Sequence, residues 1–350
     1  MKHIVDLDDF SLEEVEKIIN KAFEIKNNPD VFLESMKGKI LANLFFEPST
    51  RTQFSFQAAM FKLGGQTLGF SNSLDTSVSK GESFKDTIKV VSSYADVLVV
   101  RHFQEGAAYC ASLFSSCPVI NAGDGGHLHP TQTLIDIFTI LEYKKRLNNL
   151  IIGICGDLLF SRTVNSFLKF LTRYKNNMFI LISSENFKLP NSLKKKIIES
   201  GNSFLEYDSL GECIKSLDVL YMNRIQKERI KNLDSLKEKI IFLDEKTLEF
   251  AKEDLILLHP LPRTDEISTN VDKDKRALYF KQALNGVFVR MAIILEIFSL
   301  KKSERDCFLR FNNKFCGNAS CITKFENNLP NIFFKRGGEL YCKYCGYKKS

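Results

Sequence analysis

The sequence predicts an α/β protein with two doubly wound parallel-sheet domains joined by helices, followed by a small third module. Short apolar runs of strand length alternate with helical patterns from residue 40 to about residue 300, and such alternation favours parallel sheets covered by helices on both faces. A fresh apolar run begins at residue 149, after a long helical pattern over 131–146. Beyond residue 300 the alternation ends, and polar sequence with paired cysteines follows. We therefore expect domains at 1–134 and 135–285, a helix at 286–304 that returns to the first domain, and a third domain at 305–350.

The first expected elements have clear boundaries in the sequence. Ser11 and Glu14 form a capping box, which predicts a helix that ends near Lys26. The apolar run 40–46 has the length of a strand, and residues at helical spacing follow it up to Gly64-Gly65, a typical helix C-terminus. By the same reasoning we expect further strands at 95–100, 118–121, 149–155, 178–183, 219–222, 240–243 and 255–258.

Two features of the sequence argue against export and against a membrane segment. Three aspartates lie among the first nine residues, directly behind the first apolar ones, which a signal peptide would not tolerate. The longest late apolar stretch, 287–300, contains Arg290 and Glu296 and is too short to span a bilayer. We therefore expect a cytoplasmic protein without a membrane partner.

The positive charge of the chain is concentrated near its C-terminus. The formal net charge is +7, and residues 1–300 carry 38 Lys+Arg against 38 Asp+Glu, whereas residues 301–350 carry 11 against 4. A basic tail is one way to bind nucleic acid. The Lys-, Asn- and Phe-rich composition, however, indicates mutational bias as much as function.

The turn at residues 47–52, Glu-Pro-Ser-Thr-Arg-Thr, is rich in hydroxyls for a link between a strand and a helix. A helix N-cap would explain one Ser or Thr at this place. Capping does not explain Ser49, Thr50 and Thr52 together with Arg51. Free backbone amides, hydroxyl donors and a guanidinium fork suit a dianionic phosphate. The turn therefore predicts a phosphate site.

Arginines recur in the turns that follow other expected strands. Ligands of α/β sheets gather beyond the C-terminal ends of the strands, and there the sequence places Arg101, Arg162, Arg224 and Arg263. A single arginine in such a turn is usually a surface residue. Recurrence in both expected domains favours a cleft for two ligands that together carry several negative charges.

His129 is the best candidate for acid or polarising chemistry. It follows the glycine-containing turn 121–127 and directly precedes Pro130 and a helical pattern. A neutral imidazole near a helix N-terminus is a good hydrogen-bond donor to a carbonyl oxygen. An equally good interpretation is a histidine that merely caps the following helix. Elsewhere Gly153 and Gly156 faintly suggest a dinucleotide turn, but the full glycine motif is absent, which argues against a nicotinamide cofactor.

The C-terminal cysteines have the spacing of a metal site. They read Cys316-x4-Cys321-x20-Cys342-x2-Cys345, and two close pairs about twenty residues apart are a strong four-cysteine zinc signature. Four thiolates leave no open coordination position, so the Zn²⁺ should be structural rather than catalytic. The earlier cysteines are isolated and are expected to be inert thiols.

These motifs, taken together, resemble the catalytic subunit of the aspartate carbamoyltransferase family over roughly residues 1–303. The matching segments are 46–52, 101–102, 129–132, 156–163, 224–229 and 259–263. Residues 305–350 instead resemble the zinc domain of that enzyme's separate regulatory chain. The nucleotide-binding domain of the regulatory chain has no counterpart, so the resemblance implies a fusion that keeps the metal module alone.

The resemblance implies transfer of a carbamoyl group from carbamoyl phosphate to L-aspartate, without a catalytic cofactor. It implies that the phosphate is held by Ser49, Thr50, Arg51, Thr52 and Arg101, and that His129, Thr52 and Arg51 face the carbonyl oxygen. Gln132 and the Leu261 carbonyl would orient the carbamoyl NH2, with Pro260 also at the substrate. Arg162 and Arg224 would bind the aspartate carboxylates, with Gln226 beside them.

The resemblance also implies a homotrimer or a higher homo-oligomer with shared active sites. Ser77 and Lys80 match a loop that, in the family, reaches the active site of the neighbouring subunit, and Lys80 then joins the catalytic set. The zinc module would be an architectural staple or an assembly surface between trimers.

Two other functions compete with this one. Ornithine carbamoyltransferase shares the first and third motifs, but its usual His-Cys-Leu-Pro and Ser-Met-Gly signals are absent, and His259-Pro-Leu-Pro-Arg263 stands instead. A nucleic-acid-binding protein could use the basic zinc tail on a vestigial enzyme body. The intact set of anion-binding residues argues against decay, so a nucleic-acid partner is not expected.

Overall fold

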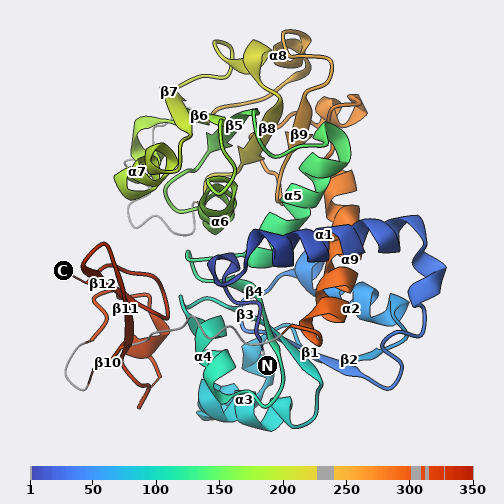
Figure 1. Ribbon diagram of the computed structural model, residues 1–350, viewed down its shortest axis with the longest axis vertical. Coiled ribbons are helices and arrows are strands. Elements are labelled where there is room, and N and C mark those ends of the chain that lie inside the picture. The colour runs from blue at the N-terminus through green and yellow to red at the C-terminus, as the bar shows by residue number, and fades with distance from the viewer. Residues whose placement is uncertain (1, 227–239, 301–308, 312–314, 327, 350) are drawn as a thin grey trace. The chain divides into compact units, whose positions relative to one another are not determined.

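The structure, a computed structural model, describes residues 2–226, 240–300, 309–311, 315–326 and 328–349. It separates into two compact units, one made of Met1–Thr131 with Gly286–Ser350 and the other of Gln132–Asn285. Each unit contains its own parallel sheet (Figure 1), which confirms the predicted α/β class. Among the described residues, no helix combines the length and the apolar character needed to cross a membrane.

The sheet of the first unit has four parallel strands in the order β2-β1-β3-β4. Its strands are β1 (Ile40–Phe45), β2 (Gln66–Phe70), β3 (Val97–His102) and β4 (Val119–Asp124). The inner strands β1 and β3 are almost wholly buried, because helices cover both faces of a parallel sheet, and they therefore read as continuous apolar runs. Parallel pairing brings the C-terminal ends of β1, β3 and β4 to one edge of the sheet.

Helix α1 (Leu12–Asn27) of the first unit begins where the sequence predicts. In the capping box of α1, Glu14 N donates to Ser11 Oγ at 3.1 Å and Ser11 N donates to Glu14 Oε2 at 2.9 Å. The remaining helices of this unit are α2 (Thr50–Lys62), α3 (Phe84–Ser92) and α4 (Ala107–Phe114). The boundaries between the two units fall within α5 (Pro130–Lys144) and α9 (Tyr279–Ile297).

The sheet of the second unit has five parallel strands in the order β7-β6-β5-β8-β9. Its strands are β5 (Ile151–Gly156), β6 (Met178–Ile182), β7 (Ser203–Tyr207), β8 (Val219–Asn223) and β9 (Ile256–Leu258), and its helices include α6 (Arg162–Leu171), α7 (Asn191–Glu199) and α8 (Glu245–Glu249). The C-terminal ends of β5 and β8 are adjacent, because Gly156 pairs with Asn223.

Two parts of the predicted strand pattern were wrong. The strand expected at 240–243 is reduced to a single bridge between Leu243 and Ile267, and Leu243 is the one buried residue of that run. Conversely, β2 and β7 were not expected. Both are edge strands with polar residues and largely exposed faces, so they lack the continuous apolar run of an inner strand.

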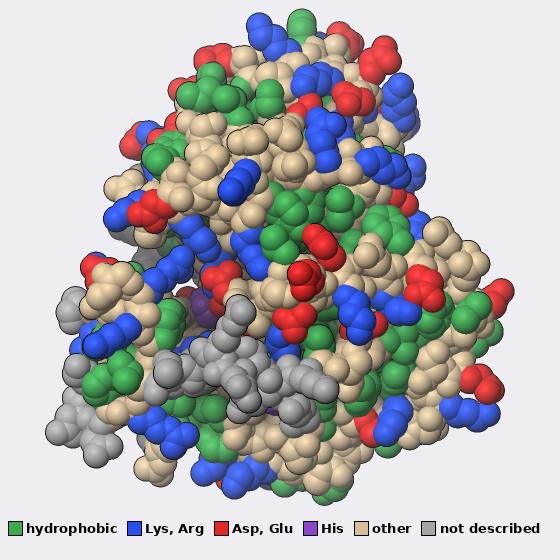
Figure 2. Space-filling model, viewed as in Figure 1, with side chains coloured by type: hydrophobic (Ala, Val, Ile, Leu, Met, Phe, Trp, Pro, Cys, Tyr) green, Lys and Arg blue, Asp and Glu red, His purple; other side chains and the backbone are tan. Residues whose placement is uncertain are grey.

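The C-terminal module contains a small antiparallel sheet in the order β10-β11-β12. Its strands are β10 (Leu309–Arg310), β11 (Ile332–Arg336) and β12 (Glu339–Cys342). The module shares one apolar core with the first unit, in which Ile322 and Tyr344 pack in a cluster that contains Ala107 and Cys110 of α4. Figure 2 shows Lys, Arg and apolar side chains interspersed on the visible surface of this module.

Candidate active site and metal centre

The hydroxyl-rich segment lies where predicted, and it runs from the end of β1 into the first turn of α2. Ser49 occupies the N-cap position, but its side chain accepts no capping hydrogen bond. Instead Ser49 Oγ donates to Thr52 Oγ1 at 3.1 Å. Thr52 is buried and Arg51 is exposed. The two hydroxyls and the first amides of α2 therefore form a local polar group, and Arg51 is the residue next to Thr52 in the chain.

Arg101 is held next to this turn by the pairing of β1 with β3. Phe45 is the register partner of Arg101, and Phe46 N donates to Arg101 O at 2.8 Å. The guanidinium donates from Nη1 to Ala122 O at 3.1 Å, and its Nη2 lies 3.1 Å from Glu47 Oε2. These two contacts fix the Arg101 guanidinium at the C-terminal edge of the sheet. A bound anion could there replace the Glu47 carboxylate as its partner.

His129 lies beyond the end of β4, directly before α5. Its side chain is 5% exposed, and its Nδ1 is 3.5 Å from Thr131 Oγ1. The preceding loop is organised by Asp124, whose Oδ1 accepts from Leu128 N at 3.2 Å and from Asn121 Nδ2 at 3.0 Å. Because β1, β3 and β4 are neighbours, the hydroxyl turn, Arg101 and His129 all follow strand ends on one edge of one sheet.

Ser77 and Lys80 belong to a separate element, the short 3₁₀ turn Ser77–Lys80. Both residues are exposed. The turn ends at Gly81 in the left-handed region, and Glu82 N donates to Ser77 O at 3.2 Å. The expectation that this loop completes a neighbouring subunit's site stays a prediction.

The second unit places its candidate residues around Asp157, which follows β5. Asp157 Oδ1 accepts from Leu159 N at 3.1 Å and from Phe160 N at 2.8 Å, and Oδ2 accepts from Gln226 N at 3.3 Å. Asn223 Nδ2 donates to Asp157 O at 2.7 Å. Asp157 thereby joins the turn before Arg162 to the segment 223–226, so the structure brings Arg162, Arg224 and Gln226 to one edge of the second sheet.

Arg162 and Gln132 are positioned by their helices. Arg162 is the first residue of α6 and is 8% exposed. Gln132 Nε2 donates to Asp136 Oδ1 at 2.7 Å within α5, and Gln282 Nε2 and Tyr221 Oη also donate to the Asp136 carboxylate, at 2.6 and 3.1 Å. Sequence reasoning did not single out Asp136 or Asn223, because Asp136 also binds Tyr221 and Gln282, and Asn223 binds Asp157, all of which are distant in sequence. Residues 227–229 of the predicted arginine motif lie outside the described residues.

The turn that contains Pro260 and Leu261 is held by a buried His–Glu pair. His259 Nδ1 accepts from Leu261 N at 2.7 Å, and His259 Nε2 lies 2.8 Å from Glu266 Oε1. Glu266 also accepts from Thr264 N and Thr264 Oγ1. Arg263, in contrast, is engaged by Asp272 and Tyr279, so it is placed to support the turn.

We expect Glu266→Gln to weaken the acid dependence of stability. Burial raises the pKa of Glu266, but the hydrogen bond from His259 and those from the backbone outweigh burial, so the pKa is lowered overall. A lowered carboxyl pKa contributes stability above the unfolded pKa of about 4.3, and this stability is lost as pH falls through the folded pKa. The variant should be less stable than wild type at pH 7 by about 1–3 kcal/mol, with a smaller difference near pH 4.

Thermal melting of both proteins at several pH values measures this difference. A difference in stability between the two proteins that stays constant from pH 7 to pH 4 would contradict the assignment of a charged carboxylate at Glu266.

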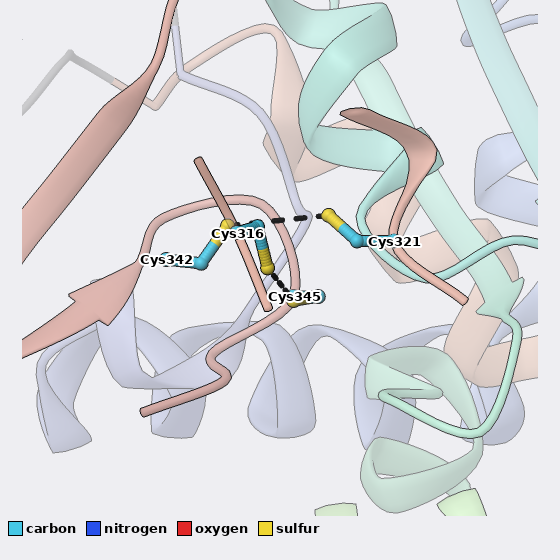
Figure 3. A group of neighbouring side chains, drawn as sticks. All are labelled: Cys316, Cys321, Cys342 and Cys345. Atoms are coloured by element: carbon cyan, nitrogen blue, oxygen red, sulfur yellow. Dashed lines mark hydrogen bonds between the residues drawn. The ribbon is translucent and has the colours of Figure 1, made fainter. Parts of the chain in front are cut away.

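The four predicted metal ligands come together in the C-terminal module (Figure 3). All four cysteines are buried, and their sulfur atoms lie within 4.8 Å of one another. Two of the separations are 3.6 Å for Cys316 to Cys345 and 4.0 Å for Cys321 to Cys342. A tetrahedral site with Zn–S bonds of about 2.3 Å has S–S edges of about 3.8 Å, whereas a disulfide needs about 2.05 Å. The geometry therefore fits a four-thiolate metal site.

Without a cation, the thiols of this cluster shift one another's pKa in opposite directions. Hydrogen bonds from the neighbouring thiols, that of Cys321 foremost, lower the pKa of Cys316, whereas hydrogen bonding with Cys316 raises the pKa of Cys345. Four thiols at this spacing cannot ionise together unless a positive ion compensates them. The cluster thus could bind a metal, as the spacing predicts.

Two family models cover most of the chain. The carbamoyl-P binding domain of aspartate/ornithine carbamoyltransferase matches residues 2–142, and the Asp/Orn binding domain of the same family matches residues 148–297. The chain belongs to the aspartate/ornithine carbamoyltransferase family. The resemblance inferred from the sequence motifs is thereby confirmed for these residues.

Named relatives of this family are similar over nearly their whole length. The aspartate carbamoyltransferase catalytic subunit of Clostridium novyi is 52% identical over 303 residues, which are 86% of this chain and 99% of that protein. The catalytic subunit of M. jannaschii aspartate transcarbamoylase has a solved structure that is 40% identical, with a TM-score of 0.79 over 85% of this chain and 98% of that one. The Trypanosoma cruzi enzyme in complex with carbamoyl phosphate and aspartate is 37% identical, with a TM-score of 0.78 over 84% and 94% of the two chains.

Proposed function

We propose that this chain transfers the carbamoyl group of carbamoyl phosphate to the amine of L-aspartate. The products are N-carbamoyl-L-aspartate and phosphate, and the reaction is an early step of de novo pyrimidine biosynthesis. The single observation that carries the proposal is the group of anion-binding residues at one edge of the first sheet, in the part of the chain that matches the carbamoyl-P binding domain. Relatives that are 52% identical carry the name of this enzyme.

In this proposal the first unit binds carbamoyl phosphate. Ser49, Thr50, Arg51, Thr52 and Arg101 hold the phosphate by charge-assisted hydrogen bonds. The carbonyl oxygen faces His129, Thr52 and Arg51, and these donors act most strongly on the negative charge that grows there in the tetrahedral transition state. The buried position of His129 supports this role, because a dry site strengthens each hydrogen bond.

The second unit supplies the groups for aspartate. Arg162 and Arg224 bind its carboxylates, with Gln226 beside them, and the turn at Pro260 and Leu261 contributes a backbone carbonyl. Gln132 and that carbonyl orient the carbamoyl NH2. The amine nitrogen attacks the carbamoyl carbon as the bond to the phosphate oxygen breaks, and a proton passes from the amine to the departing phosphate. Orientation and electrostatics suffice for this step, so the proposal includes no covalent nucleophile and no catalytic cofactor.

The proposal has two further parts, on metal and on assembly. Zn²⁺ fits the four-cysteine cluster best, because a closed tetrahedral shell of thiolates is typical of structural zinc. The active enzyme is a homotrimer or a larger homo-oligomer, in which Ser77 and Lys80 of one chain complete the site of its neighbour. Their exposure on a short turn supports this arrangement.

We expect the purified chain to form carbamoyl-aspartate from carbamoyl phosphate and L-aspartate, and no citrulline with L-ornithine in its place. The physical reason is that Arg162 and Arg224 repel the cationic side chain of ornithine. Separation of the products by chromatography measures both outcomes. Citrulline would overturn the assignment of the second unit, and no product from either amine, with salt-dependent retention on DNA, would favour the basic zinc tail as a binding module.

A further inference from the structure

The cysteine-bearing module is hydrogen-bonded to the loop that follows β3. Glu105 N donates to Ser320 O at 3.0 Å, and Ile322 N donates to Glu105 O at 2.9 Å, so that Glu105 pairs with the metal-ligand position Cys321 like a strand residue. Asn318 Nδ2 adds a hydrogen bond to Glu105 Oε2 at 2.7 Å. One loop of the first unit therefore shares its backbone hydrogen bonds with the loop that carries two metal ligands.

The next residue transmits this contact to the interior of the first unit. Gly106 has φ of 83°, and a Cβ at this position would lie 2.6 Å from Tyr344, so the module seats closely on it. Gly106 N donates to Asp124 Oδ2 at 2.7 Å. Asp124 is only 1% exposed, and a buried carboxylate that accepts backbone hydrogen bonds on both oxygens has little freedom to move.

Asp124 in turn fixes the loop that ends at His129. Its Oδ1 accepts from Leu128 N at 3.2 Å, and its Oδ2 lies 3.2 Å from His127 Nδ1. Gly346 of the module packs against the same His127, because a Cβ at residue 346 would meet the His127 Nε2 at 3.3 Å. The module therefore touches both the loop 102–106 and the loop 124–128. Asp124 connects these two loops and holds Leu128, the residue before His129.

We propose that the metal-loaded cysteine module positions His129 for catalysis through Glu105, Gly106 and Asp124. This inference rests on the proposed function and assigns Asp124 as a positioning residue. The four cysteines belong to the same apolar core as Ala107 and Cys110 of α4. A metal that holds the thiolates together keeps that core closed and Glu105 paired, whereas its loss frees the loops at 102–106 and 124–128.

Hydrogen exchange of the full chain tests this link without any measurement of activity. Zinc is removed with a chelator and then restored, and exchange is followed at 102–106, 121–129 and 151–156. We expect removal to speed exchange about tenfold or more in the first two segments and to leave the third, in the other unit, unchanged. Faster exchange confined to residues 309–349 would overturn the proposal.

A substitution supplies the kinetic test. Asp124→Asn keeps the shape of the side chain but replaces one of its acceptor oxygens by an NH2 group. We expect kcat to fall about 10- to 100-fold, with the KM for L-aspartate within about 3-fold of wild type and with the zinc content unchanged, because a donor displaced by about 1 Å loses most of its effect on the transition state.

The matched control is Lys343→Met. It removes another contact of the module with the first unit, the ion pair of Lys343 with Asp9 at 3.2 Å, but lies outside the Glu105–Asp124 link. Its kcat should stay within twofold of wild type, and an equal loss in both variants would overturn the proposal. A wild-type chain without activity would refute the proposed function alone, and if Asp124→Asn fails to fold, hydrogen exchange still decides the link.

Discussion

Replacing His129 by alanine should lower kcat about 10²- to 10³-fold while the protein keeps its fold. The imidazole is placed at the start of α5 and is 5% exposed. In the proposed reaction it donates to the carbonyl oxygen as negative charge develops there. Removal of one such donor costs about 2.7–4 kcal/mol of transition-state stabilisation. Steady-state kinetics with saturating carbamoyl phosphate and L-aspartate measure the loss.

The variant His129→Gln tests the role of the donor itself. Its side-chain amide is a neutral donor of similar reach, so it should recover part of the lost kcat, whereas a residue that only caps α5 would show no such recovery. A kcat of His129→Ala within tenfold of wild type, at unchanged thermal stability, would show that the residue serves as a helix cap.

The second large effect is expected for Arg51→Ala, with a fall in kcat/KM of about 10³-fold or more. Arg51 is an exposed residue in the first turn of α2, directly beside the hydroxyl pair of Ser49 and Thr52. In the proposal, the Arg51 guanidinium contacts both the phosphate and the carbonyl oxygen. Its removal therefore weakens substrate binding as well as stabilisation of the transition state. The ratio is measured at low carbamoyl phosphate and saturating L-aspartate.

Two variants separate this contact from a general effect of charge. Lys62→Ala removes one positive charge from the exposed C-terminal end of the same helix and should change kcat/KM less than threefold. Arg51→Lys keeps the charge but loses the planar fork, so it should recover only a minor part of the activity. Equal losses at residues 51 and 62 would mean that the positive field of the unit, and no specific contact, binds the phosphate.

Local sequence predicted much of the fold, because inner strands and helix starts have local signatures. β1 and β3 are buried on both faces and read as apolar runs, and the capping box at Ser11 sets the start of α1. The edge strands β2 and β7 were missed, since half-exposed strands carry no such run. The strand expected at 240–243 was wrong, since Leu243 alone of that run is buried and makes a single bridge, while Ile241 is only partly buried against the core.

The residues of the candidate site were likewise only partly predictable from local sequence. The hydroxyl turn, Arg101 and His129 were found from sequence, because each follows a strand end and parallel strands must end at one edge. The sequence could not show which carboxylates hold the candidate groups of the two units. Asp124, Asp157, Asp136 and Glu266 act through partners that are close only in the folded chain.

By itself, the sequence determined the family, the α/β class and the four cysteines that could bind a metal. These depend on local motifs and on spacing, which folding does not alter. Only the tertiary structure decided that the four thiols surround one point and that Glu105 pairs with the loop carrying Cys321. Residues 105 and 321 are far apart along the chain, and burial of a common apolar core brings their backbones together.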